Sequence, residues 1–498
     1  MILYAFLLLI AIGVLVAFGN WRRGIFFFIL LGAIQDPVRK LIPGAPSYLV
    51  LATVPVLFAT FFQAFASNPY FRREFRQYHP RPAAAIAAFV ISLLPAAVVS
   101  ATYGPGSWQL TLIGMLSYST AILSFYLGFI YARNADDIRR LAVFFCLVTA
   151  VMLIGTPLEY LGLAKEWTAI GGKALGFKWL RYKPGYIIEM VAGFYRSPDI
   201  MGWHAVIMAM LAGILALLGK GRRRYFWIAV ACWGIAAAML CGRRKMVLML
   251  PVYMLTVSLI YWQLRMPFRK LLAAVAIVLV GTYFIYQQIG SSTELENYYT
   301  QEQGDIIERF EAHNLGDMIG TYQQNGFWGA GLGTASQGTQ HLQVARPRTW
   351  QEGGLSRILV ELGVPGLLCF LFLCLSFLAA IWRLVCSQLD ISVPGLPLSL
   401  GLIGIVAANG VSFIYSHQIF GDPFVMGFFC FLLGITFSGE RVGIVVRVGA
   451  QRPAWLSRYG PPPFARQFAA PQAENSLEAV PCAEVHSVAS VADRPPFT

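Results

Sequence analysis

The sequence predicts an all-α polytopic membrane protein with about 12–13 transmembrane helices and two large extracytoplasmic loops. Of its 498 residues, 57% are hydrophobic and 12% are charged, whereas soluble domains are about 45–50% apolar and about 25% charged. A soluble globule of this size could not bury that excess and would expose large apolar patches. The apolar residues also gather in runs of about 20, the length of helix that crosses a bilayer.

Thirteen apolar runs are candidate transmembrane helices. They cover residues 1–19, 24–36, 46–66, 82–101, 108–131, 141–163, 201–218, 225–241, 246–262, 271–289, 364–382, 396–416 and 422–438. The second run is short, which leaves open a re-entrant or tilted segment. Residues 1–19 have no basic region before the apolar stretch, so we expect a helix there and not a signal peptide.

Lysine and arginine in the short loops predict the side that each loop occupies. With thirteen spans, the basic loops fall on one face, near residues 22–23, 72–81, 133–140, 220–224, 265–270 and 383. The positive-inside trend makes this face the cytoplasm. The N-terminus is then outside and the C-terminus is cytoplasmic.

The same scheme divides the chain into six parts. They are N-terminal transmembrane helices (1–163), a first extracytoplasmic loop (164–200), central helices (201–289), a large extracytoplasmic loop with an amphipathic helix (290–363), C-terminal helices (364–438) and a disordered cytoplasmic tail (439–498). Loops beyond about 12–15 residues are usually functional or disordered. Trp, Gly and aromatic residues in the two outer loops favour order, whereas the Pro-rich tail is typical of disorder.

One basic cluster breaks the positive-inside trend. Gly242-Arg243-Arg244-Lys245 fills a very short loop between the eighth and ninth spans, and by parity it faces outside. Either a span is miscounted or the outer mouth of the bundle needs fixed positive charge, because charge near the membrane usually marks a site. Arginine suits phosphate because its planar fork makes two parallel hydrogen bonds. We expect Lys245 to meet lipid headgroups instead.

The outer loops carry further positive charge. The arginines concerned are Arg196 in the first loop and Arg309, Arg346, Arg348 and Arg357 in the second. They favour a cationic chamber for an anionic substrate that arrives from the membrane. The alternative is a solvated basic loop on anionic headgroups. The net charge of +14 lies in clusters between apolar runs, so it indicates topology and not nucleic-acid binding.

The second outer loop ends in a predicted amphipathic helix on the outer interface. Its apolar residues follow i, i+3, i+4, i+7 spacing: Leu355, Ile358, Leu359 and Leu362. Arg357 and Glu361 are four residues apart and can pair. Residues 363–366, Gly-Val-Pro-Gly, are expected to turn the chain into the eleventh span.

Four short segments between residues 140 and 440 carry a family resemblance. They are residues 193–202, 241–245, 329–333 and 352–366. In this order they resemble the G-T-F-x-x-P-N-x-x-G, S-G-S-R, G-V-G-L-G and H-[NSQ]-x9-G-x-x-G motifs of the O-antigen ligase/polymerase superfamily. Its members are bacterial membrane glycosyltransferases that act on polyprenyl-diphosphate glycans. The resemblance puts Arg244 at the functional arginine of the family.

Among the departures from these motifs, three bear on the proposed site. Asp199 stands where Asn is usual, and Arg243 stands where Ser is usual. Glu352 stands at the catalytic His of the ligases. The polymerases of the superfamily lack that His, so the resemblance is nearer to the polymerase type.

The resemblance implies a metal-independent glycosyltransferase of the bacterial inner membrane with no cofactor. Its donor would be a glycan on undecaprenyl diphosphate, used for O-antigen or exopolysaccharide synthesis. Arg244 would stabilise the leaving diphosphate, and Glu352 or His341 would accept the proton of the attacking hydroxyl. The substrate-binding set would be Arg243, Arg196, Arg309, Arg346, Arg348 and Arg357. Membrane lipids and other polysaccharide-assembly proteins are the expected partners.

Two other functions stay open. A transporter or flippase of lipid-linked or anionic solutes would also be helical and positively lined, although it should contain inverted repeats and charged helices at the midplane. The second open function is that of a ligase, which would transfer glycan to lipid A core or to a protein. Glu352 could also be a helix N-terminal carboxylate that faces the macrodipole. We expect His204 and His417 to be structural, and the sequence has no cluster with metal-ligand spacing.

Overall fold

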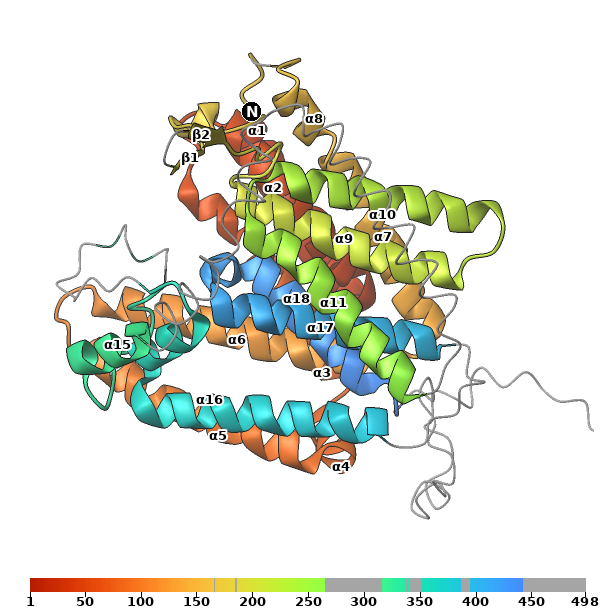
Figure 1. The fold of residues 1–498 in the computed structure, drawn as a ribbon. Coiled ribbons are helices and arrows are strands. Elements are labelled where there is room, and N and C mark those ends of the chain that lie inside the picture. Colours follow the sequence, from red (N-terminus) through yellow and green to blue (C-terminus); the bar gives the residue numbers. More distant parts are fainter. Residues whose placement is uncertain are drawn as a thin grey trace, which may run out of the picture. The chain divides into compact units, whose positions relative to one another are not determined.

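The computed structural model describes residues 1–164, 166–183, 186–264, 316–336, 339, 342, 351–386 and 395–441. Within these residues the chain is helical apart from one small hairpin (Figure 1). The helices of the first half are α1 (Ile2–Gly19), α2 (Trp21–Leu41), η1 (Ser47–Leu51), α3 (Thr53–Ser67), α4 (Phe71–Tyr78), α5 (Pro80–Ala101), α6 (Ser107–Tyr131), α7 (Ala135–Met152) and α8 (Gly155–Tyr160). The expected all-α fold class is confirmed.

The second half continues this pattern. Its elements are η2 (Lys173–Leu175), β1 (Leu180–Lys183), β2 (Tyr186–Glu189), α9 (Pro198–Leu218), α10 (Arg222–Leu240), α11 (Arg244–Gln263), α15 (Asp317–Asn325), α16 (Gly354–Cys386), α17 (Leu396–Tyr415), η5 (Gln418–Gly421) and α18 (Pro423–Ser438). The antiparallel hairpin β1–β2 lies in the first long loop and was not expected from the sequence.

The chain is a multi-pass membrane protein. In the part of the chain that the structure describes, nine helices are long and apolar enough to cross a membrane. They are Ile2–Gly19, Ser47–Ser67, Pro80–Ala101, Ser107–Tyr131, Ala135–Tyr160, Pro198–Leu218, Arg244–Gln263, Gly354–Val385 and Leu396–Tyr415. The shorter α18 is also apolar. Each expected span coincides with a helix, except 271–289, which lies outside the described residues.

The helix at the second expected span, residues 24–36, is longer than the apolar run: α2 covers Trp21–Leu41. Asn20 caps α2 by accepting hydrogen bonds from the backbone of the first turn, and the helix continues through Pro37 to Leu41. Asp36 and Lys40 are buried near its end. The apolar run underestimates the helix because these charged residues have protein partners, described below, and not lipid.

The long loops gather at one end of the helices, which we call the loop end. Lys40, near the end of α2, donates a hydrogen bond to the carbonyl of Gly193 at 3.1 Å. Leu332 donates its backbone N–H to the carbonyl of Ala96, near the end of α5, at 3.1 Å. The loop before α9 and the loop after α15 therefore lie at the same end of the bundle.

The opposite end holds the basic loops. Arg22, at the start of α2, bonds the carbonyl of Tyr131 at the end of α6. His79, before α5, lies 3.0 Å from the carbonyl of Phe437 through its Nε2, and Arg441 donates to the carbonyl of Ala132 at 2.7 Å. Successive spans therefore run in alternating directions, as the placement of the basic loops on one face predicts. The arginine-rich loops after α1, α3 and α6 share this end.

Exposed aromatic rings border both ends, as they do where a bilayer meets water. At the loop end the exposed rings include Tyr48, Trp108, Trp167 and Trp328. At the opposite end they include Tyr70, Tyr225, Trp262 and Trp382. The two sets support the same boundaries as the apolar runs between them.

Helix α9 forms the buried centre, since 89% of its apolar window is buried in the protein. It packs against α7, α10, α11 and α17 (Figure 1). A second close pair is α6 with α18. There, a Cβ on Gly434 would lie 1.9 Å from the carbonyl oxygen of Phe125, so the absence of a side chain lets the two backbones touch.

Helix α16 bends sharply at Gly363, where φ is 66°. This is the turn expected at residues 363–366. The preceding segment is a helix, and its apolar face packs in a cluster with Phe89, Leu93 and Leu332. Its polar face is also buried, with Glu361 at 0% exposure. The glycine-rich loop after α15 contributes to covering the polar face, since Ser336 donates a hydrogen bond to Glu361. The position of this segment at the outer interface stays a prediction.

Candidate functional site

The candidate site is built around the first turn of α9. Ser197 caps the helix by accepting a hydrogen bond from the backbone of Ile200 at 3.3 Å. Pro198 follows at the first helical position, where its missing backbone N–H would have had no partner within the helix. Asp199 follows, where a carboxylate is stabilised by the positive end of the helix dipole. The turn thus fixes Asp199 at the loop end.

Asp199 joins α9 to the start of α11. Its Oδ2 lies 3.0 Å from Arg243 Nε, and its Oδ1 lies 2.8 Å from Lys245 Nζ. Lys245 also donates to Ser416 Oγ at 3.0 Å and to Gln418 Oε1 at 3.3 Å. We call these five residues the Asp199 cluster. It ties together α9, α11 and the segment between α17 and α18.

Lys245 does not meet lipid headgroups, so that expectation is wrong. Its side chain is only 9% exposed, and an ammonium has three donors to satisfy. The carboxylate, hydroxyl and amide oxygens named above supply three acceptors. Arg243 is the more open of the two cations, at 23% exposure.

The ion pair between Asp199 and Arg243 joins two residues at which the sequence differs from the motifs that it resembles. Asp199 gives Arg243 a carboxylate partner, and Arg243 is the second cation on a carboxylate that Lys245 also contacts. Neighbouring Gly242 has a φ of +64°, and a Cβ there would lie 2.8 Å from the Met190 side chain.

Glu352 lies beside this cluster, at the start of α16. Its carbonyl accepts a hydrogen bond from the backbone N–H of His417 at 2.9 Å. The ring Nδ1 of His417 lies 3.1 Å from the same oxygen, and because a carbonyl only accepts, Nδ1 carries the proton. His417 is directly between Ser416 and Gln418, the two partners of Lys245. The structure therefore brings Glu352 next to the basic residues of α11.

His417 is a buried neutral residue, as expected. Burial lowers the pKa of its imidazole from 6.5 to about 3, and the positive charges of Arg357 and Lys245 add to the lowering. A neutral ring with Nδ1 protonated holds the Glu352 backbone in place. Its role in the site is thus to position the start of α16.

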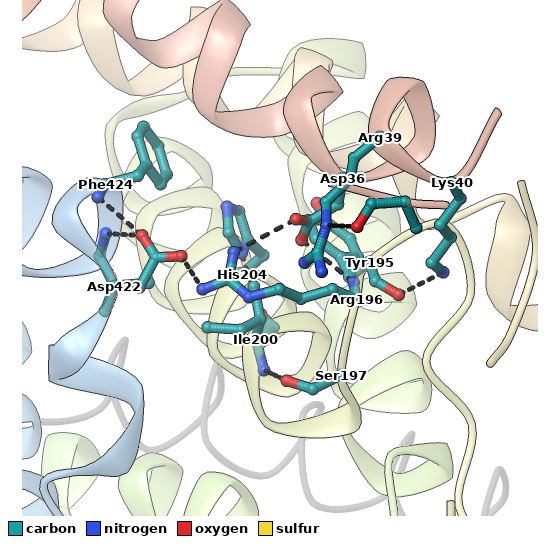
Figure 2. Close-up of polar contacts among 12 residues, drawn as sticks. Asp36, Arg39, Lys40, Tyr195, Arg196, Ser197, Ile200, His204, Asp422 and Phe424 are labelled. Atoms are coloured by element: carbon teal, nitrogen blue, oxygen red, sulfur yellow. Dashed lines mark hydrogen bonds and ion pairs between the residues drawn. The ribbon is translucent and has the colours of Figure 1, made fainter. Parts of the chain in front are cut away.

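Arg196 has a different environment, shown in Figure 2. Its guanidinium lies 3.2 Å from Asp36 Oδ1 through Nη1 and bonds Asp422 Oδ2 through Nη2. Asp422 also caps α18 by accepting hydrogen bonds from the backbone of Phe424 at 2.7 Å and Val425 at 3.0 Å. We call Arg196, Asp36 and Asp422 the Arg196 clamp. It links α2, the loop before α9 and α18.

Two carboxylates face one guanidinium in this clamp. Burial lowers the pKa of the Arg196 guanidinium, but Asp422 and Asp36 raise it by more, so the net shift is upward. The side chains of Asp36 and Asp422 are 1% and 2% exposed. Arg196 is therefore held as a cation by the protein itself, and its contacts are those of a structural ion pair.

Lys40 and Glu159 fix the loop that carries Arg196. Lys40 donates to the carbonyl of Gly193 and to that of Tyr195 (Figure 2). Glu159, at the end of α8, accepts the backbone N–H of Ala192 at 2.9 Å and also that of Gly193. The loop is bound from both sides before α9 begins.

His204 is structural, as expected. Its Nδ1 lies 2.9 Å from the carbonyl of Ile200, and its ring stacks on Phe424 with centroids 5.4 Å apart. The ring is 1% exposed.

Arg357 belongs to a third group, which we call the Glu361 network. Glu361 accepts hydrogen bonds from Tyr118 Oη at 2.6 Å and from Ser336 Oγ at 3.1 Å. Arg357 Nε lies 3.9 Å from Glu361 Oε2, which confirms the expected pairing of these residues. Arg357 Nη2 donates to Ser117 Oγ at 3.2 Å. The network fastens the start of α16 to α6 and to the glycine-rich loop.

The glycine-rich loop at 326–336 is a packing element. A Cβ on Gly333 would lie 2.2 Å from the Leu110 carbonyl oxygen, and one on Gly331 would lie 2.5 Å from the Ser100 nitrogen. The expected close approach of backbone is therefore confirmed, and here the approach is to α5 and α6.

The proposed site residues thus separate into groups. Arg243 and Arg244 lie at the start of α11, and the backbone of Glu352 contacts His417, which lies between two partners of Lys245. Arg357 lies in the Glu361 network, and Arg196 lies in its clamp. The remaining ones, His341, Arg309, Arg346 and Arg348, lie outside the described residues. Asp36 and Asp422 were missed by the sequence argument, although a carboxylate at the edge of an apolar run was a signal that could have found them.

The chain matches no protein-family model and no curated protein sequence.

Proposed function

We propose that the chain is a bacterial inner-membrane glycosyltransferase of the O-antigen polymerase/ligase type. Its donor is a glycan on undecaprenyl diphosphate, and its product is a longer glycan for O-antigen or exopolysaccharide. One observation supports this most strongly: three consecutive cations, Arg243, Arg244 and Lys245, lie at the start of α11, and two of them, Arg243 and Lys245, share the carboxylate of Asp199. An excess of positive charge at this depth is suited to a lipid-linked anion.

The proposed reaction is a single displacement. An acceptor hydroxyl attacks the anomeric carbon, the bond from that carbon to the diphosphate oxygen breaks, and the diphosphate leaves with the electron pair. Arg244 stabilises the developing negative charge with two parallel hydrogen bonds. Glu352 takes the hydroxyl proton. The contact of its backbone with His417, one residue from the partners of Lys245, supports this role.

The Arg196 clamp assigns a different task to Arg196 within this proposal. Its guanidinium is bound by two carboxylates, so it positions the first turn of α9 and does not grip the substrate. Growing glycan, lipid A core and a protein remain possible acceptors. A transporter of lipid-linked anions is the competing function, and the experiments below separate the two.

Replacing Arg244 tests the proposal. Arg244→Ala should lower turnover of the lipid-linked donor by on the order of 10²–10³-fold, by analogy with removal of one oxyanion donor. Arg244→Lys should fail as well, since lysine keeps the charge but loses the two-pronged geometry. The measurements are glycan length on a gel and donor turnover in membranes that contain equal amounts of protein.

The matched control is Arg223→Ala, which removes an exposed arginine from the first turn of α10. It should leave turnover unchanged. Near-normal turnover in Arg244→Ala would exclude the proposed chemistry. If lipid-linked donor then accumulates on one side of the membrane, the transporter function gains.

We also propose that the loop end is extracytoplasmic. The support is the opposite end, where Arg133 lies in a short loop and Arg22 and Arg139 lie near the starts of α2 and α7. In a cysteine-free background, a cysteine at position 180 should react with an impermeant reagent in intact cells. A cysteine at position 222 should react only after the cells are opened. The reverse pattern would invert the orientation.

A further inference from the structure

Asp199 is the carboxylate in contact with the cations of the site, and its negative charge repels an anionic ligand. Its carboxylate is buried, with the residue 8% exposed, and it touches two of the three cations. A carboxylate here repels the same phosphate that the cations attract. Asp199 must therefore have a role other than direct attraction of the ligand.

The two ion pairs of Asp199 are close but poorly aligned. Within the described part of the chain, neither Asp199 Oδ1 nor Arg243 Nε has a hydrogen bond of good geometry, although both atoms are buried. The distances of 2.8 Å to Lys245 and 3.0 Å to Arg243 show that charge holds them together. Buried polar atoms without aligned partners lose much of what they would gain from a hydrogen bond. A ligand that offers aligned acceptors can compete for Arg243.

The two cations differ in how easily they can exchange partners. Lys245 is held by Ser416 and Gln418 as well as by Asp199. Arg243 is more exposed and follows Gly242, whose φ is +64°. Asp199 itself is fixed, because the clamp holds the residue three positions earlier. Exchange therefore involves movement of the Arg243 side chain, while Asp199 stays on Lys245.

We propose that Asp199 is a displaceable counter-anion for Arg243: it holds the guanidinium in the empty site and yields it to a phosphate-bearing ligand. This inference rests on the proposed function for the identity of the ligand, a lipid-linked diphosphate. When the diphosphate leaves, Asp199 takes Arg243 back. The carboxylate thus weakens anion binding and speeds release of the product.

Binding of inorganic pyrophosphate to the purified full-length protein tests the inference by calorimetry. Asp199→Asn keeps the shape and an acceptor oxygen but removes the opposing charge, so pyrophosphate should bind about tenfold more tightly. The matched control is Glu166→Gln, which removes one charge from an exposed carboxylate of the first long loop. This control should bind within about twofold of the original protein.

Turnover gives a second measurement. In Asp199→Asn both KM for the lipid-linked donor and kcat should fall, because the diphosphate binds better and leaves more slowly. A purely structural role would lower kcat without tightening pyrophosphate binding. Should Asp199→Asn fold poorly, Arg243→Gln takes its place and should weaken pyrophosphate binding about tenfold.

Three results would overturn the inference. They are equal or weaker pyrophosphate binding by folded Asp199→Asn, unchanged binding by Arg243→Gln, and no binding by any of the proteins at millimolar pyrophosphate. The outcome is separate from that for the proposed function. If Asp199→Asn binds more tightly while Arg244→Ala keeps full donor turnover, the anion site stands and the glycosyltransferase does not.

Discussion

Arg196 and Arg243 both lie at the loop end, next to the first turn of α9, yet their surroundings are opposite. Arg196 forms ion pairs with two carboxylates, those of Asp36 and Asp422. Arg243 shares one carboxylate with Lys245. From the sequence the two arginines were equal candidates for binding phosphate. The comparison teaches that the balance of charge around an arginine, and not its presence in a basic loop, decides whether it can take up an anion.

The difference arises from where the carboxylates sit in the helices. Asp36 belongs to the last turns of α2, and Asp422 caps α18, so both converge on the loop before α9. At the start of α11 the N-cap residue is Arg243 itself, without a side-chain cap hydrogen bond. One helix start is thus neutralised by acids, and the other keeps its cations beside the positive end of a helix dipole.

Removing each arginine should give the largest contrast between the two regions. Arg196→Met leaves two buried carboxylates without their cation and should lower the free energy of unfolding by about 3–5 kcal/mol. Arg243→Met leaves Asp199 paired with Lys245 and should cost less than about 1 kcal/mol. The measurement is denaturant-induced unfolding of the purified proteins in mixed micelles.

A triple variant serves as the control for this contrast. Replacing Asp36 and Asp422 by Asn together with Arg196→Met removes the unpaired charges and should recover part of the lost stability. Equal destabilisation by Arg196→Met and Arg243→Met would mean that the two environments do not differ as described.

Acid should destabilise the α11 side gradually, through His417. Its pKa is about 3 in the folded protein and 6.5 as the ordinary value, so the unfolded chain binds the proton first. Stability is then complete above pH 6.5 and declines as the pH falls toward 3, by about 1.4 kcal/mol per pH unit.

This pH dependence is measured by unfolding the protein at a series of pH values. His417→Asn keeps a donor for the Glu352 carbonyl but does not titrate, so its unfolding curve should be flatter over the same range. An identical slope in both proteins would assign the acid sensitivity to other groups.

Much of the fold follows from the sequence because a bilayer imposes a fixed length on apolar helices. The runs at residues 82–101 and 201–218 became α5 and α9 with ends displaced by a few residues. Helix α2 was underestimated since the argument assumed that Asp36 and Lys40 end a span. Their partners come from a loop about 160 residues away, and a local pattern contains no trace of such contacts.

The sequence could identify the cationic residues of the candidate site but not the ion pairs that they form. The cations of α11 stood out because they violate the positive-inside trend. The ion pair between Asp199 and Arg243 could not be derived, since it depends on how α9 and α11 pack. The dipeptides Ser197-Pro198 and Asp422-Pro423 could have predicted the starts of α9 and α18, because in each a capping residue precedes proline.

The Arg196 clamp has a consequence for how the protein is made. Asp36 and Arg196 leave the ribosome long before Asp422. During synthesis Arg196 therefore first has one carboxylate, and the second arrives only with α18, the last helix in the part of the chain that the structure describes. Until then the loop before α9 lacks one of its anchors, although Lys40 already holds its carbonyls. Insertion of α18 therefore completes an ion pair begun by the earliest helices. A chain that stops before α18 lacks that final carboxylate, which distinguishes an unfinished protein from a finished one.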